Sequence, residues 1–369
     1  MFKRISLVSL SLLAISLLSI PAQALDLTAG LKTGNLELSS AGPISFGPQG
    51  ILFVGDTKAA QICAIDTGDT KGSPEKAMIH VKGLNQVIAG LLGTSGSDIL
   101  INDMAVNPAS GNTYISASSS RGPEAKPVLL RVSTSGKVTI VSLKNVKFGT
   151  AKLPNPPAPG GTGRRNLRSP SITDLAYIDG RVIVAGLSNE EFASTLRAIP
   201  FPFQSVDGGA GIEIFHGAHG RFETRSPVRT FTTYNIDKQP HLLAAYTCTP
   251  LVKFPLKKLK AGSKVKGVTI AELGNRNRPL DMFVYSKDGK DYILMANSAR
   301  GVMKITTDNI GKQEAITKKV ESGKTAGQKY DTIERLKGIV QLDRLNSSHA
   351  VVLIESDGGS VDLSTVELP

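Results

Sequence analysis

The stretch ISFGPQGILFVGD, at positions 44–56, contains two short apolar runs on either side of a turn made of glycine and proline. Short apolar runs separated by Gly, Pro, Asn or Asp are typical of β-hairpins. After a second turn the chain continues into another apolar run, QICAID at 61–66. The pattern predicts antiparallel strands that follow one another along the chain.

The same unit recurs through the rest of the chain. Clear copies occupy positions 103–132, 174–186, 281–305 and 338–354, and a weaker copy occupies 241–254. Their turns are roughly 49 to 69 residues apart, at Gly50, Gly111, Gly180, about Pro240, Gly289 and Asn346. A propeller blade takes about 40 to 50 residues, so these intervals leave room for inserted loops. We therefore predict an all-β fold, a β-propeller of six blades, or of seven if 211–215 and 229–231 form a blade of their own.

Helical signals are rare in a composition with 37 Gly and 20 Pro. The one helix we expect spans 189–198, because Ser188 or Asn189 can cap its first turn and two glutamates follow. Pro200 would end it. A doubly wound α/β fold needs helices between its strands, so the pattern disfavours that class.

The repeated units resemble those of the large propeller superfamily that includes NHL-repeat and lactonase-like proteins. The residues that carry the resemblance are FGPQGILFV at 46–54 and their later echoes, which span most of the chain. The resemblance is closest to a group of secreted bacterial propellers. It implies the fold and no particular activity.

The N-terminus has the three parts of a signal peptide. Lys3 and Arg4 precede an apolar run over 5–20, and Ala22-Gln23-Ala24 is a cleavage motif. The run is short for a hydrocarbon core of about 30 Å, which disfavours a membrane anchor. We expect a signal peptide over 1–24, cleavage after Ala24, and a single propeller domain over 25–369 in the periplasm or outside the cell.

The formal net charge is +12, and loss of Lys3 and Arg4 with the signal peptide leaves about +10. Such a charge attracts a small anionic ligand or an acidic envelope protein, whereas nucleic acid is not expected in this compartment. We expect a monomer with no membrane span in the mature chain. The densest basic stretch, 253–266, is interpreted as a solvated hairpin whose lysines protect a strand edge.

Three units place an aspartate at the start of their first strand: Asp103, Asp174 and Asp281. If those strands line a central channel, the three carboxylates stand at one mouth and could gather a cation, calcium being the natural choice. The alternative is that each carboxylate accepts backbone N–H bonds and holds its own turn.

Two histidines, His216 and His219, lie three residues apart in a glycine-rich segment that favours a turn. In a turn both imidazoles can face one ion, with Cys248 and His241 as further ligands, and such a nitrogen and sulfur set suits zinc or copper. The alternative is a pair of surface histidines without a metal.

The two cysteines, Cys63 and Cys248, could form a disulfide in an oxidising compartment. The alternative is a buried Cys63 and a Cys248 that is a free thiol or a ligand. The Pro- and Gly-rich segment at about 150–170 predicts a long inserted loop carrying Arg164, Arg165 and Arg168, which is either a passive insertion or a lid or partner-binding arm.

Two functions fit these observations. The first is an exported periplasmic propeller that acts as a ligand-binding, protein-binding or scaffold module, because the sequence has no P-loop, dinucleotide fingerprint, zincin helix or nucleophile elbow. The second is a lactonase-like, metal-dependent hydrolase with its site at the mouth of the central channel, where a bound ion activates water.

Overall fold

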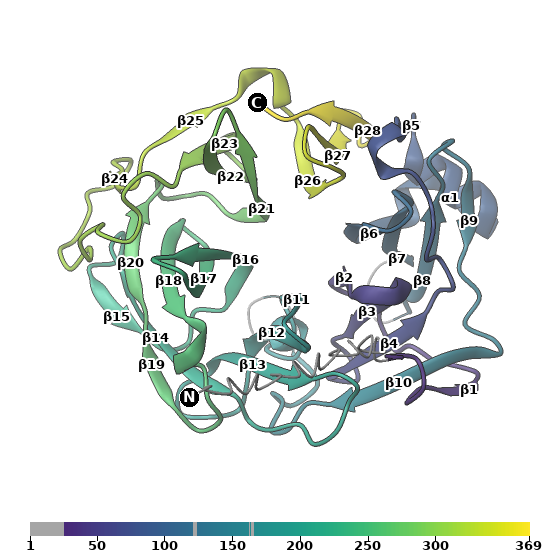
Figure 1. Ribbon diagram of the computed structural model, residues 1–369, viewed down its shortest axis with the longest axis horizontal. Coiled ribbons are helices and arrows are strands. Elements are labelled where there is room, and N and C mark those ends of the chain that lie inside the picture. Colours follow the sequence, from purple (N-terminus) through teal and green to yellow (C-terminus); the bar gives the residue numbers. More distant parts are fainter. Residues whose placement is uncertain (1–25, 121–123, 162, 164–165) are drawn as a thin grey trace, which may run out of the picture.

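The protein is a six-bladed β-propeller (Figure 1). The structure, a computed structural model, describes residues 26–120, 124–161, 163 and 166–369. The predicted signal peptide therefore lies outside the described residues. Each blade is a twisted, mainly antiparallel sheet whose first strand lies nearest the central axis.

We number the blades by the chain order of their innermost strands. Blade 1 contains β2 (Ile44–Phe46), β3 (Ile51–Asp56), β4 (Gln61–Asp66), β10 (Val146–Lys152) and β1 (Lys32–Gly34). Blade 2 contains β6 (Ile99–Val106), β7 (Thr113–Ser119), β8 (Lys126–Val132) and β9 (Val138–Ile140). Blade 3 contains β11 (Asp174–Ile178), β12 (Arg181–Leu187), β13 (Ser194–Pro200), β14 (Ala210–His216), β15 (Arg221–Glu223) and β19 (Lys264–Lys266).

Blade 4 contains β16 (Val228–Ile236), β17 (Gln239–Tyr246), β18 (Pro250–Pro255), β20 (Val268–Glu272) and β24 (Ala326–Gly327). Blade 5 contains β21 (Pro279–Lys287), β22 (Lys290–Asn297), β23 (Gly301–Thr306) and β25 (Tyr330–Thr332). Blade 6 contains β26 (Ile339–Arg344), β27 (His349–Glu355), β28 (Val361–Glu367) and β5 (His80–Val81). The α-helix α1 spans Leu84–Leu92, and short 3-10 turns span Pro48–Gly50, Pro74–Lys76, Gly96–Asp98, Ser169–Ser171, Leu256–Lys258 and Glu334–Leu336.

The blades do not follow one another round the ring in chain order (Figure 1). Blade 1 lies between blades 2 and 3, and blade 6 lies between blades 5 and 2. After blade 2 the chain returns through β10 to the outer part of blade 1, and then builds blades 3 to 6 in the opposite direction round the axis. The ring closes where β5, which precedes blade 2 in sequence, pairs with β28 of the last blade.

The hydrophobic core consists of layers between neighbouring blades. The second strand of each blade is almost fully buried, as in β3, where Ile51, Leu52, Phe53 and Val54 have no exposed surface. Burial of such side chains stabilises the fold by roughly 1.5–3 kcal/mol each. Clusters of buried residues join blades 1 and 3, blades 1 and 2, blades 2 and 6, and blades 5 and 6, while the largest joins blades 3, 4 and 5.

The predicted helix over 189–198 is wrong. Ser194–Pro200 is the strand β13, which is hydrogen-bonded to β12 along its whole length and to β14 near its start. The pairing buries Leu196 and Ile199, and this tertiary gain overrides the local capping signals.

A seventh blade is absent from the described residues. The segment 211–215 lies in β14, the fourth strand of blade 3, and 229–231 lies in β16, the first strand of blade 4. The basic stretch 253–266 begins in β18 and forms most of its connection to β20, which pairs antiparallel with β18. The last part of this connection forms β19, which pairs in parallel with β14 and so covers part of that strand's edge. In the described part of the chain, no helix is long and apolar enough to cross a membrane.

Candidate functional site

A pocket of about 1060 Å³ opens at the face of the propeller where the inner strands begin. Pro43, Thr173, Arg229 and Arg278 line it at or beside the starts of four inner strands, and Asn102 lines it from the first half of a fifth, β6. Five of the six blades thus contribute to one cavity at the mouth of the central channel. We call it the mouth pocket.

The charged side chains that line the mouth pocket are all basic. They are Lys58, Arg225, Arg229 and Arg278, and the described lining residues include no Asp or Glu. The Nε of Arg229 is buried without a hydrogen-bond partner. Burial, together with the charge of Arg278, lowers the pKa of Arg229 to about 10, so its guanidinium remains a cation at neutral pH. The described lining of the pocket therefore presents positive charge to an anion.

The inserted loop forms one wall of this pocket. Asn166, Leu167, Ser169 and Pro170 line the cavity, and the backbone N–H of Ser169 donates to Oδ1 of Asn166 at 3.1 Å. Arg168, between these lining residues, has its Nε and Nη1 buried without hydrogen-bond partners. Two other basic residues named from the sequence, Arg164 and Arg165, lie outside the described residues.

The predicted channel aspartates do lie on inner strands, but their carboxylates bind backbone. Oδ2 of Asp103 accepts the N–H of Ile44 at 2.7 Å. In the same way Oδ2 of Asp174 accepts the N–H of Phe231 at 2.7 Å, and Oδ2 of Asp281 accepts an N–H at 3.2 Å. In each case the donor belongs to the neighbouring blade, so each carboxylate links two blades.

A fourth aspartate, Asp343, belongs to the same set although the sequence pattern did not single it out. Its Oδ2 accepts the N–H of Val106 at 2.7 Å, which joins blade 6 to blade 2 where the ring closes. It lies near the end of β26, so a search for aspartates at the starts of strands does not find it. The buried register of an inner strand, rather than its first residue, is the signal that would have found it.

Burial raises the pKa of all four carboxyls. The pKa of Asp174 rises to about 7 and that of Asp343 to about 6. For Asp103 and Asp281, burial and repulsion from the other aspartates raise the pKa well above the ordinary value. In the described part of the chain, these aspartates do not form a group of three closely spaced ligand atoms of the kind that holds a metal ion. The geometry thus favours linkage between blades over the calcium site.

The histidine pair lies on the same face of the propeller, farther from the axis. His216 ends β14, and His219 lies in the turn that follows. The turn is closed by the N–H groups of His219 and Gly220, which donate to the carbonyl oxygen of His216 at 3.1 and 2.8 Å. The two imidazole centroids are 3.8 Å apart. The predicted turn is confirmed, and it places both rings on one side.

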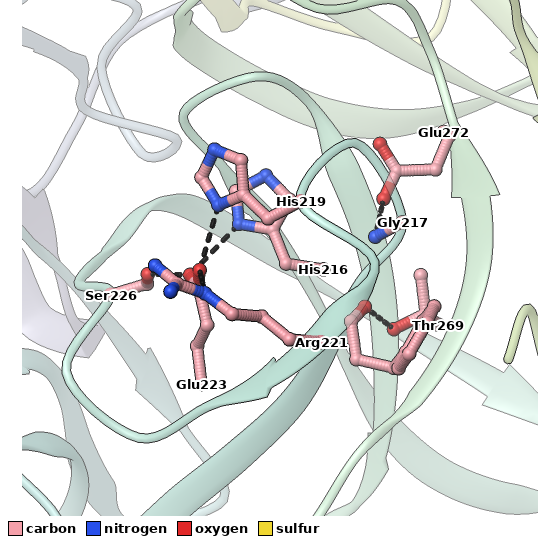
Figure 2. A network of polar contacts seen from close by, with 9 residues as sticks. His216, Gly217, His219, Arg221, Glu223, Ser226, Thr269 and Glu272 are labelled. Carbon is pink, nitrogen blue, oxygen red and sulfur yellow. Dashed lines mark hydrogen bonds and ion pairs between the residues drawn. The ribbon is translucent and has the colours of Figure 1, made fainter. Parts of the chain in front are cut away.

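One carboxylate orients both rings (Figure 2). Oε2 of Glu223 lies 2.9 Å from Nδ1 of His216, and Oε1 lies 2.7 Å from Nδ1 of His219. Ser226 and Arg221 also donate to Glu223, at 2.5 and 3.1 Å. Burial opposes ionisation of Glu223, but the hydrogen bonds from His216, Ser226 and His219 outweigh it and hold the pKa of the carboxyl well below its ordinary value.

The buried Glu272 positions the turn itself. Its Oε1 accepts the N–H of Gly217 at 2.5 Å (Figure 2). A Cβ at Gly217 would lie 2.7 Å from this oxygen, so the close approach requires glycine. Burial raises the pKa of Glu272 to about 7, against the effect of its hydrogen bonds from Gly217 and Ala218, with Glu223 adding to the rise.

Cys248 joins the histidines. One ligand atom from each of His216, His219 and Cys248 lies within 4.8 Å of the others. Cys248 is in the turn between β17 and β18, and the preceding Thr247 lines the mouth pocket. The other expected ligand, His241, lies near the opposite end of β17, where its Nδ1 is 2.8 Å from the carbonyl oxygen of Gln239.

The considered disulfide is not formed. Cys63 and Cys248 are both free. Cys63 is fully buried in β4 of blade 1, where burial raises the pKa of its thiol to about 12, with the charge of Asp56 adding to the rise. Cys248 is in blade 4, so the blade architecture keeps the thiols in different sheets.

No protein-family model and no curated protein matches the chain. Solved structures with a similar arrangement include the PQQ-bound aldose sugar dehydrogenase from Streptomyces coelicolor, with 12% identity over 91% of this chain and 96% of that one and a TM-score of 0.35. The WD40 propeller domain of Doa1 has 9% identity over 91% and 95%, with a TM-score of 0.32. Streptogramin B lyase has 9% identity over 92% and 97%, with a TM-score of 0.31. At these levels of similarity the activities in those names do not transfer to this chain.

Proposed function

We propose that the protein is an exported binding propeller that holds a small anionic ligand in the mouth pocket. The observation that carries the proposal is the set of three arginines, Arg225, Arg229 and Arg278, which line one cavity with no acidic side chain among its described lining residues. A volume of about 1060 Å³ suits a small organic anion. A guanidinium group can donate two parallel hydrogen bonds to two oxygens of one carboxylate or phosphate, so the pocket suits a ligand with either group.

Calorimetric titration of the purified mature protein with citrate and inorganic phosphate tests the proposal. We expect saturable binding of at least one anion, weaker at higher salt, and none of uncharged glycerol. Arg229→Gln and Arg278→Gln should each weaken binding by roughly 10- to 150-fold, since a hydrogen bond to a charged group contributes roughly 1.5–3 kcal/mol.

The control is Arg181→Gln. Arg181 is exposed at the start of β12, at the strand end opposite the one that reaches the pocket, and its loss makes the same change in net charge. Equal affinities for the wild type and for both pocket variants would reject the mouth pocket as the anion site. N-terminal sequencing of the exported protein separately tests cleavage after Ala24.

The metal-dependent hydrolase remains a second candidate function, and one observation favours it. The cluster of His216, His219 and Cys248 lies on the same face as the pocket, and the residues Arg225 and Thr247, which are close to it in sequence, line the cavity. Zinc-dependent hydrolysis of a lactone that is lost in His219→Ala would support this candidate. Equal turnover by that variant and the wild type would reject it.

A further inference from the structure

The cluster of His216, His219 and Cys248 has a property that an ordinary surface histidine pair lacks. Both Nδ1 atoms are engaged by Glu223, so each ring has its Nε2 left over. His216 is only 2% exposed, and its Nε2 is buried without any hydrogen-bond partner. An unsatisfied buried polar atom costs roughly 1–3 kcal/mol, so a ligand for this nitrogen would recover that free energy.

The carboxylate contacts engage the same nitrogen, Nδ1, of each ring. A neutral imidazole that donates its Nδ1 proton to a carboxylate presents a bare lone pair at Nε2. A carboxylate behind a metal-binding histidine is the usual outer contact of such sites, since it fixes the tautomer and the ring orientation. Here one carboxylate, Glu223, serves both rings with separate oxygens.

The thiol of Cys248 determines which metal ions the three ligands favour. The thiol of Cys248 brings a soft ligand to within 4.8 Å of a nitrogen from each ring. Two imidazoles and a thiolate match zinc and copper and are a poor set for calcium or magnesium, which prefer oxygen. The cation of Arg221 contacts Glu223 and weakens the attraction for a metal ion, whereas the carboxylate of Glu223 offsets it.

We propose that His216, His219 and Cys248 form a binding site for a zinc-class transition-metal ion on the rim of the mouth pocket. The proposal does not rest on anion binding, because neither histidine nor the thiol lines the pocket. Three protein ligands leave a fourth position of a tetrahedral ion for water or another ligand. Binding replaces the sulfur–hydrogen bond of Cys248 by a sulfur–metal bond and releases one proton to solvent, so affinity rises with pH.

The test uses the mature protein in low-salt buffer without phosphate or citrate, with ZnCl₂ as the titrant and CoCl₂ as a spectroscopic probe. We expect one zinc ion per chain, and a cobalt complex with thiolate-to-metal charge-transfer absorption. Cys248→Ser and His219→Ala should each lower zinc affinity at least 100-fold, and Cys248→Ser should remove the charge-transfer band. His219→Ala is the safer variant for folding, since that side chain is 44% exposed.

Two matched controls separate ligation from general effects. His241→Ala removes a histidine at the other end of β17, and Cys63→Ala removes the only other thiol in the sequence. Both should keep the zinc affinity of the wild type. Glu223→Gln tests positioning, with an expected loss of 10–100-fold while the charge-transfer band is kept. The proposal is overturned if the wild type binds zinc no more tightly than His219→Ala, or if its cobalt complex lacks the thiolate band.

Discussion

Residues of types that can bind metal lie both at the axis and at the rim of the propeller. They differ in whether their polar atoms are already hydrogen-bonded within the fold. At the axis, Asp103, Asp174 and Asp281 direct their carboxylates to backbone N–H groups of neighbouring blades. At the rim, Glu223 takes up one nitrogen of His216 and leaves the other buried and unbonded. The axial carboxylates use their bonding capacity within the fold and hold blades together, whereas the unsatisfied nitrogen of His216, beside His219 and Cys248, can accept a ligand.

The largest expected effect concerns pH at the axis. Burial raises the folded-state pKa of Asp174 to about 7 from an ordinary value of 3.8. Its contribution to stability is therefore complete below about pH 4 and is lost as the pH rises to about 7, on the order of 4 kcal/mol at about 1.4 kcal/mol per unit. Denaturant melts between pH 4 and 8 should show a smaller slope for Asp174→Asn than for the wild type. Identical slopes would mean that folding does not raise the pKa of Asp174.

The second largest effect is expected at the rim, where zinc should stabilise the protein. Zinc at 100 times its dissociation constant should stabilise the wild type by about 2.7 kcal/mol. Asp281→Asn, at the axis, should show the same gain, and His216→Ala should show none. Thermal melts with and without zinc measure the difference. A gain that depends on Asp281 and not on His216 would reverse the assignment of the two regions.

A smaller loss should follow from opening one link between blades. Asp343→Ala leaves the N–H of Val106 without its acceptor where the ring closes, so the free energy of unfolding should fall by about 2 kcal/mol at pH 5. The exposed Asp357 provides the control, because Asp357→Ala should change stability by less than about 0.5 kcal/mol. Urea unfolding distinguishes the two, and equal stabilities would argue against a structural role for the axial carboxylates.

The smallest effect is expected in the turn of the rim cluster. Gly217→Ala brings a methyl group against Glu272 and should cost about 1 kcal/mol, together with a modest loss of zinc affinity as His216 shifts. Gly208→Ala is the comparison, since a Cβ at Gly208 meets nothing within 4 Å. Urea melts and zinc titrations of both variants test this. If Gly217→Ala keeps the stability and the zinc affinity of the wild type, the turn can move without cost.

The hairpins and the rim turn could be predicted because both depend on neighbouring residues. Alternating apolar runs and Gly-containing turns act over a few positions, and they gave the six inner hairpins. The turn from Gly217 to Gly220 was predicted in the same way. By contrast, 189–198 has the caps of a helix, and yet its second half, 194–198, lies in β13, because β12 and β14 pair with that strand. Local helix signals are overridden where neighbouring strands supply hydrogen bonds and burial.

From the sequence alone, the repeated hairpin units determined a propeller of six or seven blades, and a glycine-rich turn determined that His216 and His219 could face one ion. Only the tertiary structure decided the ring order, the return of β10 to blade 1, and the meeting of those histidines with Cys248 from another blade. The physical reason is the distance along the sequence between the residues that interact. Hairpin formation is governed by residues close in sequence, whereas blade docking depends on buried surfaces and backbone N–H groups that come together only when the ring closes.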